Sequence, residues 1–465
     1  MKHQLICNNH STRLLLIFAG WGMDAGVFAG LSRSGYDIMV VWDYTSLHID
    51  WNCIAQYDEV CLLAWSLGVY AATKTTHAIN YKITRRIAVN GTTHPIDDRL
   101  GIPVDTFYGT LVGLNEATLR KFQRRMCVDR EDYARFCAHL PQRPVDELIN
   151  ELQAVADSLI LSVPGVTEWD MAFVGRNDRI FPPINQRRAW LEAGVEVRIL
   201  NCGHYPDFER IIAEHFIDKV AMEQRFGRGM ATYSANATVQ SEVIDRMMVM
   251  LRNSNILKGM QNRVSEVLEI GSGSGLLTRR IVDFAPKALL TLWDMAADKP
   301  EGLPDTTRML KCDAEMQIHR IEPESFDCIF SASTIQWFNS PRHFLEGCAA
   351  ALKPGGCAVL STFVEGNLHQ IKNLTGSSLP LLRPDELLRM AGEHFDIVAS
   401  SVYERDLDFD SPLDVLRHLR LTGVTSLGDG HETARALTIA KHYPMMLDGR
   451  FHLTYRPMIL ILSKK

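Results

Sequence analysis

Short apolar runs bounded by turn residues recur through the first 210 positions of the chain, and longer amphipathic stretches separate them. This alternation predicts a parallel sheet that helices bury on both faces. The runs are LLLIFAG (14–20), IMVVWD (38–43), VCLLAW (60–65), RRIAVNGT (85–92), DMAFVGRND (170–178) and EVRILNCG (196–203). Residues 113–160 break the alternation, because they are helical in period and rich in charge. We expect a helical insertion there.

A second series of strand-like runs begins after about residue 260. Its members are RVSEVLEIG, ALLTLWDM, TRMLKCDA, FDCIFSAS, GGCAVLSTF and the terminal RFHLTYRPMILILSKK. The stretch between the two series is helical in pattern apart from the GRG at 227–229. The change of pattern near residue 220 predicts two α/β domains, residues 1–219 and 220–465. Two domains also suit a chain longer than one hydrophobic core usually organises.

The bulk composition argues against several classes of protein for this chain. Hydrophobic residues make up 46% of the 465 positions, charged residues 22%, and the net charge is -6. These values are typical of a globular protein and argue against disorder and against a nucleic-acid partner. No apolar stretch reaches the roughly 18 residues of a membrane span, and the 10 cysteines include no C-x-x-C pair. We expect a soluble, cytoplasmic protein with free thiols, no metal site and no membrane partner.

The stretch VLEIGSGSGLLTRRI in the second series reads as a buried strand, a glycine-rich turn and a helix start. Gly271, Gly273 and Gly275 let the backbone turn tightly and approach a ligand, and the helix N-terminus offers free N–H groups. A dinucleotide fingerprint needs glycine at position 276, which is leucine here. The G-x-G-x-G spacing after the acidic Glu269 instead favours S-adenosylmethionine.

Two carboxylates follow at later strand ends. Asp294, in LLTLWDM, can accept hydrogen bonds from both ribose hydroxyls. Asp313, in KCDAE, comes after the third strand, within reach of an adenine amino group. A glycine loop alone would equally fit a structural turn. With ALKPGG before the fifth strand, the whole series predicts a Rossmann-like class I S-adenosylmethionine-dependent methyltransferase.

The second domain also resembles a known family, the malonyl-acyl-carrier-protein O-methyltransferase of biotin synthesis, usually called BioC. The resemblance rests on RFGRGMATYSANATVQ, FSASTIQWF and VLRHLRLTGV. The methyl-acceptor residues that it implies are Tyr233, Gln336, Trp337, Arg417 and Arg420. In this interpretation one of the arginines holds carboxylate or phosphopantetheine oxygens. Two alternatives stay open, namely Trp337 as a core residue and the arginines as a solvated helix face.

In the first domain, VCLLAWSLGVYAA places Ser66 between a buried strand and a helix. A nucleophile elbow needs small residues two before and two after the serine, and Ala64 and Gly68 occupy these positions. An α/β-hydrolase presents its serine, acid and histidine in that chain order. Asp178 and His204 each follow a strand end and supply this order. We therefore predict an α/β-hydrolase with a Ser66, His204 and Asp178 triad.

Other interpretations of this region stay open. Asp97 and Asp98 compete for the role of the acid, although they precede the insertion. FAGWGMD follows the first predicted strand, where this fold supplies a backbone donor for the oxyanion. We expect the N–H groups of Trp21 and Leu67 to form that pair. The alternative is an apolar turn in which Trp21 is simply buried.

The first domain, residues 1 to about 218, resembles the BioG type of pimeloyl-acyl-carrier-protein methyl ester esterase. LLLIFAGWGMD, LLAWSLGVYAA and AVNGTTHPID carry this resemblance. It implies acyl transfer, in which Ser66 attacks the ester carbonyl, methanol leaves, and water releases the free acid.

Four basic residues of the insertion are spaced at i, i+1, i+4 and i+5, which puts them on one side of a helix. They are Arg120, Lys121, Arg124 and Arg125. An acidic acyl carrier protein with a phosphopantetheine arm would suit this cluster. The alternative is a solvated helix face whose charges pair with nearby acidic residues such as Glu116.

Together the two resemblances predict a bifunctional enzyme of biotin synthesis. Its second domain would methylate the free carboxylate of a malonyl thioester, carried by acyl carrier protein or coenzyme A. Its first domain would hydrolyse the methyl ester of pimeloyl-acyl carrier protein. Two alternatives remain: a methyltransferase fused to a general esterase or thioesterase of another pathway, or to a non-catalytic carrier-binding module.

Overall fold

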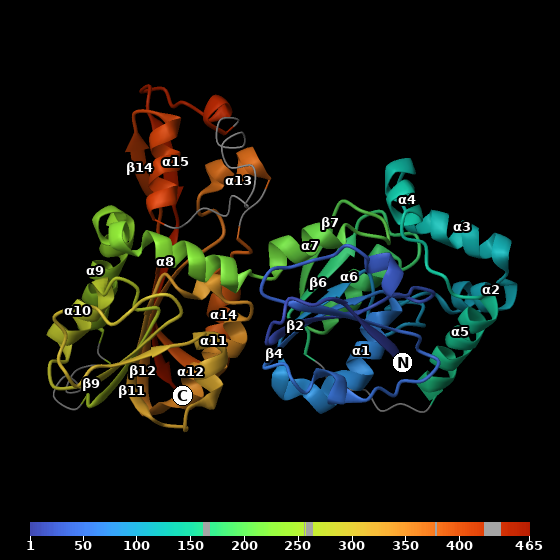
Figure 1. Ribbon diagram of the computed structural model, residues 1–465, viewed down its shortest axis with the longest axis horizontal. Helices are drawn as coiled ribbons and strands as arrows, with labels where there is room; N and C mark the ends of the chain where they lie inside the picture. Colours follow the sequence, from blue (N-terminus) through green and yellow to red (C-terminus); the bar gives the residue numbers. More distant parts are fainter. Residues whose placement is uncertain (161–167, 255, 257–263, 377–378, 423–438) are drawn as a thin grey trace. The chain divides into compact units, whose positions relative to one another are not determined.

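The computed structural model describes residues 1–160, 168–254, 256, 264–376, 379–422 and 439–465. The chain divides into two compact units, Met1–Asp218 and Lys219–Lys465, each built around its own seven-stranded sheet (Figure 1). Within the described part of the chain, no helix has both the length and the apolar character that a membrane crossing requires.

The sheet of the first unit has the strand order β1-β3-β2-β4-β5-β6-β7. Its strands are β1 (Lys2–Cys7), β2 (Arg13–Phe18), β3 (Asp37–Trp42), β4 (Glu59–Trp65), β5 (Ile83–Val89), β6 (Met171–Gly175) and β7 (Glu196–Leu200). Strands β2 to β7 are parallel and overlap the predicted apolar runs. The pattern missed β1, an antiparallel partner of β3, because its first half is exposed and lacks an apolar run.

Helices cover both faces of this sheet, and every residue of β4 and β5 is buried, as a parallel sheet requires. The α-helices are α1 (Leu67–Thr75), α2 (Val104–Gly113), α3 (Glu116–Met126), α4 (Arg130–Cys137), α5 (Val145–Ile160), α6 (Pro183–Glu192) and α7 (Phe208–His215). Short 3₁₀ helices span Ala25–Phe28, Trp51–Ile54 and Thr76–Lys82.

The insertion consists of α2 to α5, which group together at one end of the first unit (Figure 1). It begins at Val104, earlier than the predicted residue 113, directly after the N-cap Pro103. The sequence VDTFYGTLVG hid this helix, because two glycines and several β-branched and aromatic residues weaken its helical pattern.

The sheet of the second unit has the order β10-β9-β8-β11-β12-β16-β13. Its strands are β8 (Glu266–Ile270), β9 (Leu289–Asp294), β10 (Arg308–Lys311), β11 (Phe326–Ala332), β12 (Leu352–Phe363), β13 (Phe395–Val402) and β16 (Pro457–Lys464). The first five are parallel, whereas β16 is antiparallel to β12 and β13. β14 (Arg405–Phe409) and β15 (Phe451–Tyr455) form a separate ribbon. The terminal apolar run is therefore two strands, and Pro457 starts the second.

The α-helices of the second unit are α8 (Lys219–Asn236), α9 (Thr238–Asn253), α10 (Leu276–Phe284), α11 (Ala314–Gln317), α12 (Pro341–Ala351), α13 (His369–Thr375), α14 (Pro384–His394) and α15 (Pro412–Leu421), and 3₁₀ helices span Ile318–Arg320 and Ile335–Trp337. Helix α8 continues through the GRG at 227–229, where we predicted an interruption. Helix-forming neighbours on both sides outweigh the cost of about 1 kcal/mol that each glycine adds.

Candidate active sites

Ser66 occupies the turn between β4 and α1, with its backbone at φ 59° and ψ -129°. Side-chain-bearing residues rarely adopt this conformation, so the surrounding structure must hold the strained turn in place. A Cβ added at Gly68 would come within 2.5 Å of the Phe18 and Ala19 carbonyl oxygens, and one at Gly91 would clash with the Ser66 carbonyl. The turn therefore requires glycine at both positions. The sequence pattern pointed to Gly68 but not to Gly91.

The three predicted triad residues form one connected line of side chains. Ser66 Oγ is 2.9 Å from His204 Nε2, and His204 Nδ1 is 2.9 Å from Asp178 Oδ2. All three residues are buried. A histidine held between a hydroxyl and a carboxylate in this way can take the hydroxyl proton and keep the required tautomer.

Backbone and side-chain donors fix the Asp178 carboxylate. Its Oδ1 accepts hydrogen bonds from the N–H groups of Ile180 and Phe181 at 2.8 and 3.0 Å. Its Oδ2 accepts one from Gln186 Nε2 at 2.9 Å, in addition to the contact with His204. Gln186 lies on α6 and is fully buried. Sequence reasoning missed Gln186, because a lone glutamine on a helix carries no motif.

The two competing carboxylates have local roles. Asp97 Oδ1 accepts hydrogen bonds from the N–H groups of Arg99 and Leu100, and Asp98 Oδ1 accepts one from the N–H of Val104. These contacts shape the turn before α2. Among the described residues, the carboxylate that contacts the histidine is that of Asp178.

Two buried residues hold the loop that carries His204. Trp65 Nε1 donates to the His204 carbonyl at 2.8 Å, and Asn90 Nδ2 donates to the carbonyls of Gly203 and His204 at 2.9 and 3.0 Å. Trp65 is the last residue of β4, and Asn90 directly follows the neighbouring strand β5, so both lie at the same edge of the sheet as Ser66. Sequence reasoning singled out neither of them, since their partners lie more than 100 residues away.

A cavity lies beside Ser66. Its lining residues are Trp21, Ser66, Leu67, Ile102, Thr106, Phe107, Thr110, Phe122, Arg125, Leu152 and Ile180. Most of them are apolar, and α2, α3 and α5 of the insertion supply more than half. Both predicted oxyanion donors, Trp21 and Leu67, therefore border this cavity. As the first residue of α1, Leu67 has an N–H with no acceptor inside its own helix.

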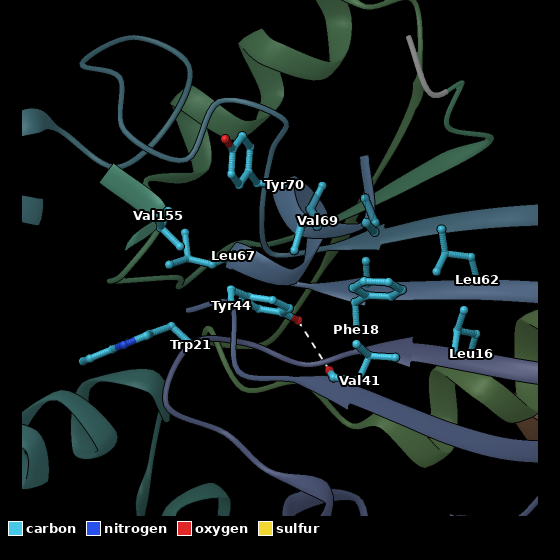
Figure 2. Close-up of a cluster of buried hydrophobic side chains, with 14 of the residues drawn as sticks. Leu16, Phe18, Trp21, Val41, Tyr44, Leu62, Leu67, Val69, Tyr70 and Val155 are labelled. Carbon is cyan, nitrogen blue, oxygen red and sulfur yellow. Dashed lines mark hydrogen bonds between the residues drawn. The ribbon is translucent and has the colours of Figure 1, made fainter. Parts of the chain in front are cut away.

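The packing below the cavity positions the loop that contains Trp21. The Trp21 ring N–H donates to the Leu148 carbonyl of α5 at 3.0 Å. Figure 2 shows Tyr44 between this loop and the core of the sheet. The Tyr44 hydroxyl donates to the Ala19 carbonyl at 2.6 Å and lies 3.4 Å from the Val41 carbonyl. The insertion and the sheet thus fix this loop from two sides.

The four basic residues of α3 are all exposed. Among the described residues, no ion pair joins any of them to an acidic side chain, contrary to the alternative of a charge-paired helix face. Arg124 stacks on Tyr133, 5.1 Å from the ring centre. Arg125 donates to the Arg179 carbonyl at 2.8 Å and also borders the Ser66 cavity. The positive charge therefore reaches the mouth of this cavity.

In the second unit, the glycine loop follows β8 with all three glycines at positive φ, namely 74° at Gly271, 49° at Gly273 and 81° at Gly275. A Cβ at Gly271 would clash with Thr334, whereas one at Gly273 would meet nothing within 4 Å. The N–H of Gly273 donates to Asp294 Oδ2 at 2.8 Å. The loop and the predicted ribose-binding carboxylate are therefore directly joined.

A cavity lies on this loop. It is lined by the four glycine-loop residues Gly271, Ser272, Gly273 and Ser274, by Asp294, and by apolar side chains that include Trp293 and Ala314. These groups fit S-adenosylmethionine: the carboxylate suits a ribose, the apolar walls suit an adenine, and the loop N–H groups suit the amino-acid end. Gly275 is absent from the lining and instead caps α10 in a left-handed conformation.

Glu269 lies beneath the loop, fully buried within β8. Neither carboxylate oxygen has a hydrogen-bond partner among the described residues, and the residue does not line the cavity. Burial raises the pKa of Glu269 to about 8. The group is therefore neutral at moderate pH in the folded chain, although the same carboxyl ionises in the unfolded chain.

This difference predicts a pH-dependent effect of Glu269→Gln on stability. Between about pH 4.5 and pH 8 the unfolded chain loses a proton that the folded chain keeps, so wild-type stability falls as pH rises. A glutamine at position 269 does not ionise, so the variant does not lose stability in this way as pH rises. The variant's advantage in free energy of unfolding should grow by roughly 1 kcal/mol per pH unit in this window. Denaturant unfolding without cofactor, followed through the transition of the second unit at several pH values, measures this difference in free energy of unfolding. A difference that does not change with pH would contradict the assignment of a neutral, buried Glu269.

Asp313 does not line the cofactor cavity, contrary to the prediction that it faces an adenine. Its Oδ2 accepts a hydrogen bond from Lys219 Nζ at 2.7 Å, and its Oδ1 accepts one from the N–H of Glu315. Lys219 is 1% exposed and also pairs with Glu315. The carboxylate is thus turned toward a buried cation that the sequence places 94 positions earlier.

A smaller cavity lies next to the cofactor cavity and shares wall residues with it. Gln336 and Trp337, two of the residues predicted for the methyl-acceptor site, line this cavity. Arg417 and Arg420 do not: both are exposed on α15, whose buried face is Val415 and Leu419. Helical spacing turns them away from the packed face, which favours the solvated-face interpretation. The side chain of Tyr233 lies outside the described residues.

Comparisons with known proteins find separate matches in the two units of the chain. A family model for the pimeloyl-ACP methyl esterase BioG matches residues 1–214, and one for a methyltransferase domain matches residues 268–360. A malonyl-[acyl-carrier protein] O-methyltransferase from Bacteroides fragilis is 34% identical over 464 residues, which cover 97% of this chain and 93% of that protein. One from Chlorobium phaeovibrioides is 32% identical over 258 residues, or 53% of this chain and 97% of that protein. The crystal structure of BioG from Haemophilus influenzae has 34% identity and a TM-score of 0.41, and covers 44% of this chain and 94% of that chain.

These features define a bifunctional enzyme that combines a Rossmann-like methyltransferase with an esterase of the BioG type. The cofactor of the methyltransferase is S-adenosylmethionine. The chain belongs to the malonyl-[acyl-carrier protein] O-methyltransferase family, and the alignment with the Bacteroides fragilis protein extends through both units.

Proposed function

We propose that this chain performs two steps of biotin synthesis in the cytoplasm. The second unit methylates the free carboxylate of a malonyl thioester, and the first unit hydrolyses the methyl ester of pimeloyl-acyl carrier protein. The observation that carries the proposal is the coexistence, in one chain, of a serine–histidine–aspartate line and an S-adenosylmethionine-type cavity. The second unit makes a methyl ester, and the first unit removes one.

For the first unit we propose an α/β-hydrolase fold and mechanism. Ser66 Oγ attacks the ester carbonyl carbon while its proton passes to His204 Nε2, and Asp178 stabilises the resulting imidazolium. The proton then goes to the departing methoxide, so methanol leaves and an acyl-serine remains. Water, activated by the same histidine, cleaves this acyl ester and releases the free acid. The N–H groups of Trp21 and Leu67 stabilise the oxyanion formed in each half.

The cavity beside Ser66 supports an acyl substrate. Its walls are mainly apolar, which suits the methylene chain of a pimeloyl group, and Arg125 of the exposed basic cluster on α3 borders it. We propose that the basic residues of α3 dock an acidic acyl carrier protein, so that its phosphopantetheine arm delivers the ester to Ser66.

This docking role predicts a difference between substrates. Reversing the charge of Arg120, Lys121 and Arg124, the three residues of this cluster that do not border the Ser66 cavity, should raise KM for the carrier-bound methyl ester by at least tenfold, because electrostatic attraction to the carrier is lost. The KM for a small water-soluble methyl ester should change less than twofold. Steady-state kinetics on both esters provides the test, and equal effects on the two would contradict carrier docking.

For the second unit we propose carboxylate methylation. When bound, S-adenosylmethionine supplies an electrophilic methyl group and leaves as a neutral thioether. A malonyl carboxylate is already ionised at neutral pH, so the protein needs no general base. Its residues instead align the carboxylate with the methyl group and exclude water. The acceptor cavity that Gln336 and Trp337 line supports this role.

Complementation tests the whole proposal. The gene is introduced into two biotin-requiring bacterial strains, one lacking its malonyl methyltransferase and the other its pimeloyl methyl ester esterase. Growth of both strains without biotin is expected. Rescue of the first strain alone would favour a non-catalytic or unrelated first unit. Rescue of neither would defeat the pathway assignment, and a methyltransferase fused to a general esterase or thioesterase would then become the leading alternative.

A further inference from the structure

One buried carboxylate oxygen of the first unit serves two side chains at once. Asp178 Oδ2 lies 2.9 Å from His204 Nδ1 and accepts a hydrogen bond from Gln186 Nε2, also at 2.9 Å. The same Nε2 donates to the Phe181 carbonyl at 2.8 Å. Both atoms at this end of the amide are acceptors, so this end must be the NH2 group, with one hydrogen for each acceptor. The surroundings therefore fix the direction of the Gln186 amide.

Phe181, the second partner of this amide, touches the triad at two further points. Its backbone N–H donates to Asp178 Oδ1 at 3.0 Å, and its ring stacks on that of His204, with 10° between the planes and 6.4 Å between the ring centres. Gln186 thus holds the carboxylate directly through Oδ2, and indirectly through the residue that binds Oδ1. A carboxylate held at both oxygens resists rotation, so Oδ2 stays directed at the histidine.

The place of Gln186 argues against a contact with substrate and against a role in packing alone. The residue is fully buried on α6 and does not line the Ser66 cavity. Its Oε1 is buried and has no hydrogen-bond partner among the described residues. An apolar side chain would fill the same space without this unpaired oxygen, whose burial lowers stability. What explains a glutamine here is its NH2 group, the end that reaches Asp178.

We propose that Gln186 is a positioning residue of the esterase, which acts on the reaction only through Asp178 and His204. This inference rests on the proposed serine–histidine–aspartate mechanism of the first unit. The imidazolium that forms while Ser66 attacks needs a carboxylate whose Oδ2 already faces Nδ1. The amide of Gln186 keeps the carboxylate in this orientation without adding a charge. A glutamate at this position would instead set a second carboxyl group against Asp178, and such a pair shares one proton.

Two substitutions in the full-length chain test this role. Gln186→Leu removes the amide and keeps most of the side-chain volume, whereas Gln186→Glu keeps the shape but makes the donor ionisable. Asn185→Leu is the matched control. Asn185 is a buried amide on the same helix, and it donates to the carbonyls of Asp98 and Gly101, at 3.0 and 2.9 Å, instead of to the triad. For each protein, kcat and KM for methyl butyrate are measured between about pH 5 and pH 9, and thermal unfolding measures stability.

Gln186→Leu should lower kcat by about tenfold or more, as loss of a hydrogen bond to a charged group does. Its KM should change less than about twofold, because Gln186 does not line the cavity. Gln186→Glu should exceed Gln186→Leu in kcat at low pH, where the introduced carboxyl group still donates a hydrogen. It should then lose activity toward about pH 9, as that group ionises beside Asp178, and wild-type chain should show no such decline. Asn185→Leu should keep kcat within about threefold and the wild-type pH profile, whatever its stability.

A wild-type kcat and pH profile in both Gln186 variants would overturn the proposal. Equal losses of stability and of kcat in Gln186→Leu and Asn185→Leu would overturn it in favour of a packing role. If Gln186→Leu does not fold, the alkaline decline of Gln186→Glu decides by its presence or absence. A wild-type chain whose ester hydrolysis survives Ser66→Ala would overturn the esterase mechanism itself, and this inference with it.

Discussion

Replacing Ser66 with alanine should abolish ester hydrolysis while methyl transfer by the same chain stays at the wild-type rate. The variant loses the one hydroxyl that lies 2.9 Å from His204 Nε2, so the esterase loses its proposed nucleophile. Removing the nucleophile of such a triad lowers the rate by about 10⁴-fold or more. A fluorophosphonate should label wild-type chain at Ser66, as mass spectrometry of the digested protein would detect, and should not label the variant.

Methyl transfer by the second unit controls for misfolding of the whole chain. Ser34→Ala is the matched control for the first unit, because Ser34 is an exposed serine in the turn before β3. It should retain full ester hydrolysis and full labelling. If Ser66→Ala kept its esterase activity and its label, the nucleophile would lie elsewhere. Absence of a label on wild-type chain would instead favour a carrier-binding module without chemistry.

Replacing Gly273 with aspartate should weaken binding of S-adenosylmethionine at least 100-fold. Gly273 has φ 49°, lines the cofactor cavity, and has no atom within 4 Å of the place where a Cβ would stand. The new side chain would therefore extend into open cavity space. Its carboxylate would also approach Asp294, which accepts the N–H of Gly273. Calorimetry should give a Kd at least 100-fold weaker, because both backbone strain and lost space oppose binding.

Gly355→Asp is the control for the backbone strain. Gly355 has φ 74° and nothing within 4 Å of the place where a Cβ would stand, but it is an exposed residue near the start of β12, outside the cofactor cavity. It carries the same conformational cost without entering the cavity, so cofactor binding should stay within about twofold of wild type. Ester hydrolysis should be unaffected in both variants. Undiminished binding in Gly273→Asp would refute the assignment of the loop to the cofactor.

Both candidate sites could be traced from sequence where their residues stand at strand ends. Buried parallel strands give continuous apolar runs, and the residue after each run emerges at the carboxyl edge of the sheet. Ser66, Asp178 and His204 follow β4, β6 and β7, and the structure brings their side chains together at this edge. Gly273 and Asp294 are joined for the same reason, since β8 and β9 are neighbours.

Residues whose role depends on a partner distant in sequence could not be found in this way. Gln186 holds the Asp178 carboxylate from a helix, and its sequence neighbourhood carries no motif. Asp313 has the expected position after its strand, yet its carboxylate turns to Lys219 because a buried cation attracts it more strongly than an open cavity does. Side-chain direction at such positions is decided by packing and charge.

The sequence by itself determined the two α/β units, the strand ends that carry chemistry, and the class of each loop, because periodicity and glycine spacing are local properties of the chain. The tertiary structure alone decided which side chains meet. It placed Arg417 and Arg420 on an exposed helix face and Gln240 in the wall between two cavities. The direction of a side chain depends on helix rotation and on neighbours supplied from far along the chain, and no local pattern encodes these.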